Sequence, residues 1–166
     1  MHKPRYGIVP VEVMLSQDGF SYLDAMRRGE ILSPPIYETL GLRLKEVERG
    51  RVVVQGTPSL RFYGPVNNVH VGFTSSVLQA ALISAVQSVL EVGEMALPVE
   101  YKVNLVRPLV ETTGPVDAIA VVLYRGRSVS TAECKLVDGA GKLYAHASVT
   151  CTILTPEVKP EEKKED

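Results

Sequence analysis

Tryptophan is absent from the sequence, and only two cysteines occur among its 166 residues. Cys134 and Cys151 both fall in segments with strand-like patterns, without a second cysteine pair or a neighbouring histidine at the spacing of metal ligands. The sequence therefore favours two buried thiols in a reducing compartment over a disulfide framework. We expect no bound metal ion.

An excess of charge of either sign is also missing. The formal net charge is -1, and the basic residues are scattered along the chain rather than bunched. Such a sequence has no general attraction to nucleic acid or to an acidic membrane surface. The N-terminus, MHKPRYGIVP, lacks the apolar core of a signal peptide. We therefore expect a cytoplasmic protein that binds neither nucleic acid nor membranes.

A long segment, residues 62–90, contains no Asp, Glu, Lys or Arg. Its length raises the possibility of a membrane span. Four serines, two glutamines and a threonine within residues 73–90 argue against a span, because each polar side chain would need a partner in lipid. A helix wrapped by a sheet tolerates these residues, so the segment predicts a central buried helix.

The predicted helix follows a loop of turn-forming residues, which are Gly64, Pro65, Asn67 and Asn68. We expect the helix to begin near Gly72 and to end at the stop signals Glu91 and Gly93. The N–H groups at a helix N-terminus favour negative charge, so any chemistry should gather near His70 and Gly72.

Outside this segment the pattern predicts two short helices and six strands. Ser16 and Asp18 can cap a helix over residues 20–28, which Gly29 ends, and a brief helix is expected over residues 36–40. The predicted strands are residues 42–47, 51–56, 99–107, 116–124, 128–137 and 143–154. Two strands, one long helix and four strands with short turns predict an α+β domain with an antiparallel sheet packed on the helix.

The length of the chain favours one domain that is large enough to bury a core. We expect this domain to span residues 1–154 and to include an N-terminal helical extension. The remaining residues, 155–166, are charged and contain proline, so they should form a disordered tail.

Several short motifs resemble those of hotdog-fold thioesterases. They are Tyr6-Gly7, Glu38-Thr39-Leu40-Gly41, Lys102-Val103-Asn104, Arg107-Pro108, Arg125-Gly126-Arg127 and Leu143-Tyr144-Ala145-His146-Ala147. The chain resembles in particular the phenylacetate-degradation type of acyl-CoA thioesterase, within the 4-hydroxybenzoyl-CoA thioesterase superfamily. This resemblance implies a hotdog fold and an acyl-CoA ligand without any further cofactor. It also implies a homodimer or a dimer of dimers with active sites at the subunit interface.

The resemblance also suggests a site around the loop and the long helix. In that family a loop of the form Asn-Pro-X-Gly-X-X-His-Gly-Gly precedes the helix, and a helical Asp seven residues after the second Gly is the base or nucleophile. His70 and Gly72 match the His and the second Gly. The Asn falls on Gly64, the loop Gly on Asn67, the first Gly of the pair on Val71, the Asp on Gln79, and a water-holding Ser or Thr on or near Pro98.

Thioester hydrolysis requires a donor for the developing oxyanion and a carboxylate that attacks the carbonyl or deprotonates water. The N–H of Gly72 can be that donor, although Val71 restricts the backbone and narrows the approach. Gln79 cannot take up a proton near neutral pH. Its amide can orient a water, or it can simply be satisfied inside a helix interface. His70 can donate to a thioester oxygen, or it can have a purely structural role.

Other polar residues can contact such a ligand. Asn67 and Asn68 are turn formers first and ligand donors second. Arg107, Arg125 and Arg127 stand at strand ends and a turn, where guanidinium groups can bind the phosphates of coenzyme A. The alternative is that these arginines are solvated charges that end strands.

The sequence leaves two functions open. The first is an acyl-CoA thioesterase whose hydrolysis is weakened or lost because Gln79 replaces the carboxylate. The second is a non-catalytic protein that binds an acyl-CoA or another apolar small ligand in the same groove. A thioesterase scaffold altered in the laboratory would show the same pattern, and fold alone does not decide between these alternatives.

Overall fold

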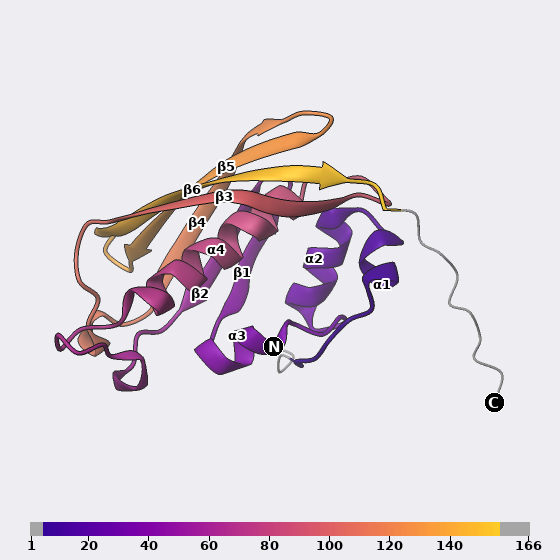
Figure 1. The fold of residues 1–166 in the computed structure, drawn as a ribbon. Helices are drawn as coiled ribbons and strands as arrows, with labels where there is room; N and C mark the ends of the chain where they lie inside the picture. The colour runs from indigo at the N-terminus through magenta and orange to yellow at the C-terminus, as the bar shows by residue number, and fades with distance from the viewer. Residues whose placement is uncertain (1–4, 157–166) are drawn as a thin grey trace.

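Helix α4, Val71–Gln87, lies at the centre of the computed structural model, which describes residues 5–156 (Figure 1). Much of this helix is buried, and Val77, Leu78, Ala81 and Leu82 have no exposed surface. Burial of side chains of this kind is a main stabilising term in folding. The charge-free segment therefore forms the central buried helix that the sequence predicts.

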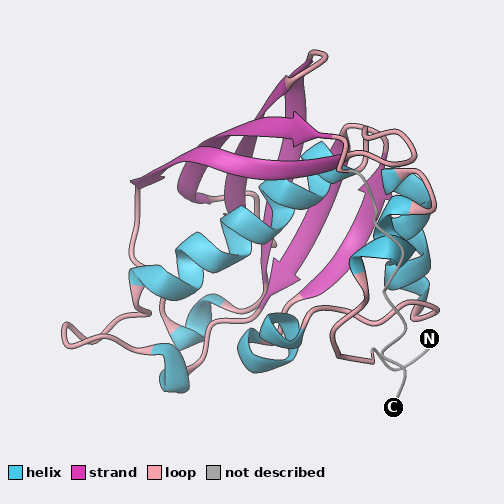
Figure 2. Ribbon diagram, turned by 45° about the vertical axis from the view of Figure 1, so that its right-hand side comes forward, coloured by secondary structure: helices cyan, strands magenta, loops and turns pink. Residues whose placement is uncertain are grey.

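Six strands form a single sheet that packs on one side of α4 (Figure 2). The strands are β1 Arg43–Glu48, β2 Arg51–Gly56, β3 Met95–Leu105, β4 Val116–Arg125, β5 Val129–Asp138 and β6 Leu143–Leu154. Their order across the sheet is β1-β2-β4-β5-β6-β3, and each neighbouring pair is antiparallel. The predicted α+β architecture is confirmed.

Small residues on the inner face of the sheet allow α4 to approach the strands closely. Ala118, Ala120, Ala132, Ala145 and Ala147 are buried at alternate positions of β4, β5 and β6. Alternate residues of a strand point to the same face, so these alanines share the face that meets α4. The leucine and valine side chains of the helix fill the space that the short alanine side chains leave.

The end of α4 and the start of β3 differ most from the prediction. α4 ends at Gln87, before Glu91, because the chain turns there and the Leu90 N–H donates to the Gln87 carbonyl (3.0 Å). β3 begins at Met95, four residues before the predicted start, because Met95 and its successors pair with the end of β6. The pairing of β3 with β6, which is distant in the sequence, sets this boundary. The local pattern of residues therefore could not predict it.

Three short helices precede the sheet: α1 Val11–Leu15, α2 Gly19–Arg28 and α3 Pro35–Leu40. Asp18 caps α2 by accepting a hydrogen bond from the Ser21 N–H (3.2 Å), as predicted. Ser16 does not cap α2. Ser16 instead ends α1, a helix that the sequence pattern does not predict, so the expected cap is wrong for Ser16. Gly29 ends α2 in a left-handed conformation, as expected.

The prediction that both thiols are buried is confirmed. Cys134 and Cys151 are free and buried, and burial raises the pKa of both. Within residues 5–156 no group of His, Cys, Asp or Glu is arranged to hold a metal ion. In the same part of the chain, no helix combines the length and the apolar character needed to cross a membrane. Most of the predicted disordered tail lies outside the described residues.

The start of α2 is fixed on the C-terminal end of α4. The Gly19 N–H donates to the Leu90 carbonyl (3.0 Å), and Arg49 pairs with Asp18 (2.8 Å). A Cβ atom added at Gly19 would lie 1.7 Å from the carbonyl oxygen of Gln87. Only glycine therefore permits this approach. The close contact holds α2 beside α4 (Figure 2).

We predict that Gly19→Ala lowers the free energy of unfolding by about 2 kcal/mol or more, because α2 must move away from backbone atoms that cannot yield. In a protein of this size that loss corresponds to a melting-temperature drop of roughly 4–8 °C, measured by circular dichroism. Gly139→Ala is the matched control, since nothing lies within 4 Å of a Cβ at that position. Equal melting temperatures for both variants would contradict this account of the contact.

Candidate functional site

The loop before α4 has a defined shape. The Gly64 N–H donates to the Asn68 carbonyl (2.8 Å), which closes the turn between them. Asn67 has a φ of 55°, a left-handed conformation that asparagine tolerates better than most residues. A Cβ at Gly64 would lie 3.3 Å from the ring of His70, so the glycine leaves room for the imidazole. The loop thus leads His70 to the N-terminus of α4.

His70 is the N-cap of α4. Its Nδ1 accepts a hydrogen bond from the Gly72 N–H (2.9 Å). Because Nδ1 accepts, the neutral ring carries its proton on Nε2, which is then a donor. The Gly72 N–H that was predicted to bind an oxyanion is therefore already paired. The neighbouring Val71 N–H donates to no residue within the described part of the chain, so it is open to an acceptor.

One stripe of α4 is less covered than the rest of the helix. It comprises Gly72, Ser76, Gln79 and Ile83, which recur at intervals of three or four residues and so lie on one face. Gln79 is exposed, and its side chain makes no hydrogen bond to residues 5–156. The alternative in which Gln79 is satisfied inside a helix interface is thus not realised within one subunit. The seven-residue spacing places Gln79 two turns from Gly72.

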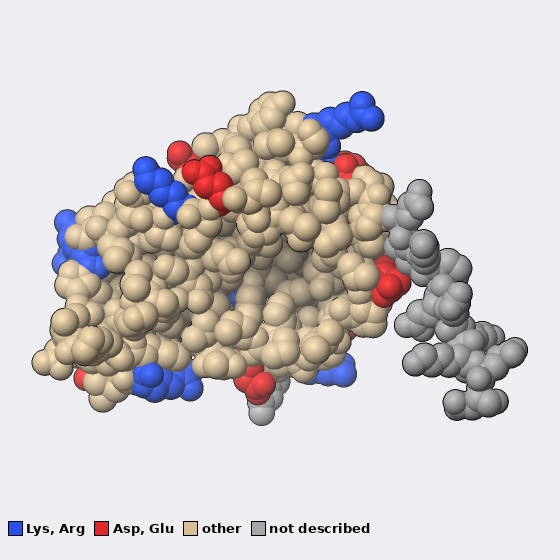
Figure 3. All heavy atoms as spheres, viewed as in Figure 1, with Lys and Arg blue, Asp and Glu red and all other residues tan. Residues whose placement is uncertain are grey.

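A cavity of about 340 Å³ opens beside Gln79, between α4 and the N-terminal helices α2 and α3. Its lining residues are Met14, Tyr22, Leu23, Met26, Pro34, Ile36, Tyr37, Leu42, Ser76, Gln79, Ala80, Ile83, Ser84 and Gln87. None of these side chains is an acid or a base of the Asp, Glu, His, Lys or Arg type. Figure 3 shows a hollow in the middle of this face, surrounded mainly by uncharged residues.

The two tyrosines of this cavity remain neutral near neutral pH. Burial raises the pKa of both Tyr22 and Tyr37. For Tyr37, a side-chain hydrogen bond with Ser84 opposes this increase only in part. The cavity therefore offers hydrogen-bonding groups and apolar surface without a formal charge. No group in it has the chemistry of a carboxylate base.

Arg107 lies at the same end of the molecule as His70. It borders a groove of about 320 Å³ together with Asn68, Val71 and Pro108. The guanidinium of Arg107 donates to the Leu143 carbonyl (2.5 Å) and is otherwise exposed. Of the three arginines predicted to meet coenzyme A, this is the one that the fold brings near the loop.

Arg125 and Arg127 lie at the opposite end of the helix. Arg125 forms an ion pair with Glu94, which follows the C-terminus of α4. Burial is the largest single influence on Glu94 and opposes its ionisation. The hydrogen bonds from Arg125 and the Glu91 N–H, together with the charge of Arg125, outweigh burial, so the pKa of Glu94 lies below its usual value. A helix of 17 residues is about 25 Å long. Within one subunit, therefore, these two arginines do not join His70.

Pro98 lies on the edge strand β3, where its missing N–H costs no hydrogen bond to a neighbour. The strand has a bulge between Pro98 and Glu100. Pro98 is exposed and does not line the cavity beside Gln79. Within one subunit the structure does not bring it to the other predicted site residues.

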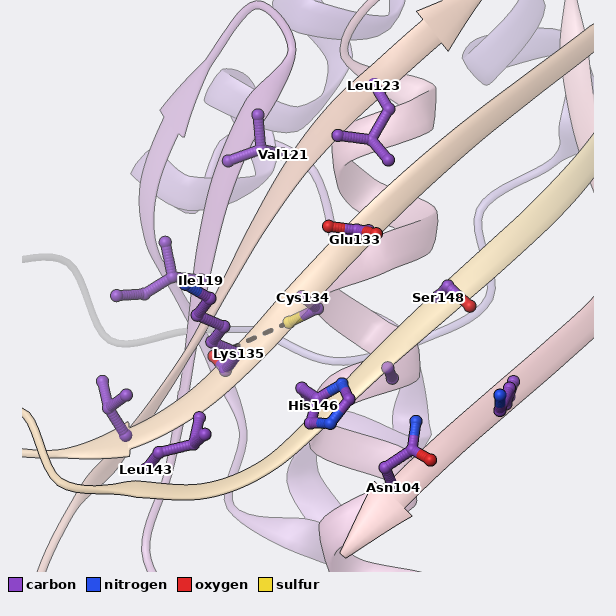
Figure 4. Close-up of a pocket in the computed structure, with 13 residues that line it drawn as sticks. Asn104, Ile119, Val121, Leu123, Glu133, Cys134, Lys135, Leu143, His146 and Ser148 are labelled. Atoms are coloured by element: carbon purple, nitrogen blue, oxygen red, sulfur yellow. Dashed lines mark hydrogen bonds between the residues drawn. The ribbon is translucent and has the colours of Figure 1, made fainter. Parts of the chain in front are cut away.

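A larger hollow, about 760 Å³, lies on the outer face of the sheet, away from α4 (Figure 4). Exposed residues of β4, β5 and β6 line it, among them Val121, Glu133 and His146. None of the residues predicted for the site from the sequence lies there. His146 thus takes a position on the outer surface of the sheet, remote from His70.

The cavity of α2, α3 and α4 was not found from the sequence. Leu23 and Met26 form an apolar stripe on α2 that is typical of core residues, and both are buried. Ile36, on α3, is exposed although it is apolar. An amphipathic pattern predicts which face of a helix is buried, but it does not predict whether a cavity remains between that helix and its neighbours. No local signal could therefore have identified this cavity.

Comparisons with known proteins agree with this geometry. No family model matches the chain. A curated relative, the 1,4-dihydroxy-2-naphthoyl-CoA hydrolase of Listeria monocytogenes, is 28% identical over 119 residues, 71% of this chain and 94% of the relative. A solved phenylacetic acid degradation-related protein from Ralstonia eutropha is 28% identical with a TM-score of 0.72, covering 79% of this chain and 98% of that chain.

The PaaI protein from the phenylacetic acid degradation operon of E. coli also has this architecture. It is 20% identical with a TM-score of 0.72, and the match covers 84% of this chain and 96% of that chain. At such identity the likeness shows the fold alone. The chain has the hotdog fold, and it is similar to hotdog-fold thioesterases of the phenylacetate-degradation type.

Proposed function

We propose that the protein is an acyl-CoA thioesterase-like hotdog protein that binds a thioester at the N-terminal half of α4. The observation that carries the proposal is the open stripe of the helix, which places Gln79 two turns from the capped N-terminus and beside an apolar cavity. The similarity to a CoA-ester hydrolase supports the class of ligand. Hydrolysis by this site should be weak or absent.

Two donors at the N-terminus of α4 can meet the thioester carbonyl. The Nε2–H of His70 is one, and the free N–H of Val71 is the other. The helix dipole adds a favourable field for a developing oxyanion at this position. The Gly72 N–H can donate to the carbonyl only if its hydrogen bond to the Nδ1 of His70 breaks or becomes bifurcated.

Gln79 determines how far the chemistry can proceed. Its amide can accept from a water and donate to a carbonyl, which is sufficient to position both. It cannot remove the proton from that water, and it does not attack a carbonyl as a carboxylate does. A bound thioester would therefore be oriented and polarised without an efficient nucleophile.

A second candidate function is non-hydrolytic binding of an acyl-CoA or another apolar ligand. The composition of the cavity favours it, because its lining contains no carboxylate. In this case the same residues orient the thioester for retention. The two candidates differ in turnover and share the site.

The ligand site is completed, in this proposal, by a second copy of the chain. β3 is an edge strand, and Leu97 and Val99 are exposed on it. An unpaired edge of this kind favours pairing with another chain. Antiparallel pairing of two β3 edges would bring the end of the second copy that carries Arg125 and Arg127 to the end that carries His70.

For catalysis, we predict that the unmodified protein hydrolyses acyl-CoAs slowly and that Gln79→Asp raises the rate at least about tenfold, because a carboxylate can deprotonate water. A thiol-release assay over short, long and aromatic acyl-CoAs measures this. Gln79→Asn is the matched control, since it has the shape of Asp without the charge. Fast turnover of the unmodified protein that Gln79→Ala leaves unchanged would place the chemistry elsewhere.

For His70, we predict that Ala and Asn substitutions separate capping from ligand contact. His70→Ala should lower stability by about 1 kcal/mol, because α4 loses its N-cap, whereas His70→Asn should keep most of it. Both variants should weaken acyl-CoA binding, since both lose the Nε2 donor. Thermal denaturation and titration calorimetry give the two readings, with His146→Ala as the control. Full binding by His70→Asn would remove His70 from the ligand site.

For assembly, we predict at least a dimer at micromolar concentration. Light scattering should give a mass of two or more chains, because pairing satisfies the free edge of β3 and covers its apolar residues. Val99→Lys should shift the mass toward one chain, since Val99 is 67% exposed and a charge there opposes pairing. Val92→Lys, at a similarly exposed residue outside the strands, is the control. A single-chain mass for the unmodified protein would exclude a shared site.

A further inference from the structure

We infer that the cavity between α4 and the N-terminal helices is the acyl pocket of the proposed thioester site, and that α2 and α3 set the size of the acyl group. This inference rests on the proposed function and adds the class of acyl group to it. Gln79 and Ser76, on the open stripe of α4, both line this cavity. A thioester held at Gln79 thus has the cavity immediately beside its acyl side.

The walls of the cavity suit an apolar group. Met14, Met26 and Ile36 contribute from the N-terminal segment, and Ala80 and Ile83 contribute from α4. Most of the lining surface is apolar, and no formally charged side chain lines the cavity. Burial of each methylene in such a site improves affinity several-fold. The arrangement favours the hydrocarbon part of a ligand over its phosphates.

The size of the cavity limits the acyl group. Since a water molecule occupies about 30 Å³ in the liquid, a volume of about 340 Å³ holds on the order of ten non-hydrogen atoms. An acetyl group would leave most of this space unfilled. A long-chain acyl group would project from it. The expected ligand is therefore an acyl group of medium length.

The wall is fixed before a ligand arrives. The N-terminus of α2 is held on α4 by the close approach of Gly19 to Gln87. In α3, Tyr37 is buried, and Leu42 just beyond it is buried as well. A preformed wall lets a pocket discriminate by size, because little ordering free energy is lost on binding.

α1 and α2 are elements distinct from the sheet and the long helix, and this chain is longer than the solved neighbour that it matches. The match to the Ralstonia eutropha structure covers 98% of that chain and 79% of this one. This chain therefore has residues without a counterpart there. α1 and α2 precede the β1–β2 hairpin, the long helix and the four later strands. Changes in α1 and α2 can therefore alter the acyl preference without altering the sheet or the long helix.

The test compares two non-hydrolysable thioethers, S-octyl-CoA and S-ethyl-CoA, by titration calorimetry. The unmodified protein should bind S-octyl-CoA at least about a hundredfold more tightly, because six further methylenes are buried. Ala80→Phe, which fills the cavity, should weaken S-octyl-CoA at least tenfold more than S-ethyl-CoA. Ala140→Phe, at an exposed turn residue, is the matched control and should alter neither affinity.

A second variant keeps the test valid if Ala80→Phe does not fold. Ile36 is 52% exposed, so Ile36→Ala should fold and should shift preference from S-octyl-CoA toward S-dodecyl-CoA by at least about threefold. Equal affinity of the unmodified protein for the octyl and ethyl compounds would overturn the inference about the acyl pocket, while the proposed function would remain. The cavity would then be a space that a partner subunit fills. Binding of neither compound would overturn the proposed function, and the inference with it.

Discussion

The close packing of α4 on an alanine-rich sheet is the constraint on which the rest of the structure depends. A helix without charged residues must be buried on most of its surface, and the short side chains of β4, β5 and β6 permit that burial. The N-terminal helices cover part of what the sheet leaves open. What remains is one stripe from Gly72 to Ile83, and the candidate site lies on it.

Residues with local signals were predicted well, and those set by distant contacts were not. The long helix, the hairpin and the four later strands follow from periodicity and turn residues, and Asp18 and Gly29 bound α2 as their chemistry requires. The start of β3 depends on pairing with the far end of β6, and α1 is too short to give a periodic pattern. Neither can be decided from neighbouring residues.

The same distinction holds for the candidate site. Gly72 and Gln79 are seven residues apart on one helix, so their shared face follows from helical geometry alone. The relative positions of the three arginines could not be predicted in this way. The sequence shows that each lies at a strand end or a turn, but not at which end of the molecule that strand end lies. Arg107 lies near the loop, whereas Arg125 is paired with Glu94 at the far end of α4. The paired state of the Gly72 N–H was equally invisible, since it depends on the rotamer of His70.

The chemistry of position 79 can be understood from the apolar cavity beside it. A carboxylate there would lose water when an acyl group filled the cavity, and desolvation raises the pKa of such a group. That cost is tolerable for an enzyme, which gains a base from it. A neutral amide avoids the cost and still orients a carbonyl or a water through its donor and acceptor. In the function proposed above, Gln79 would therefore suit retention of a thioester better than its hydrolysis, because the amide offers hydrogen bonds without the charge that the chemistry requires.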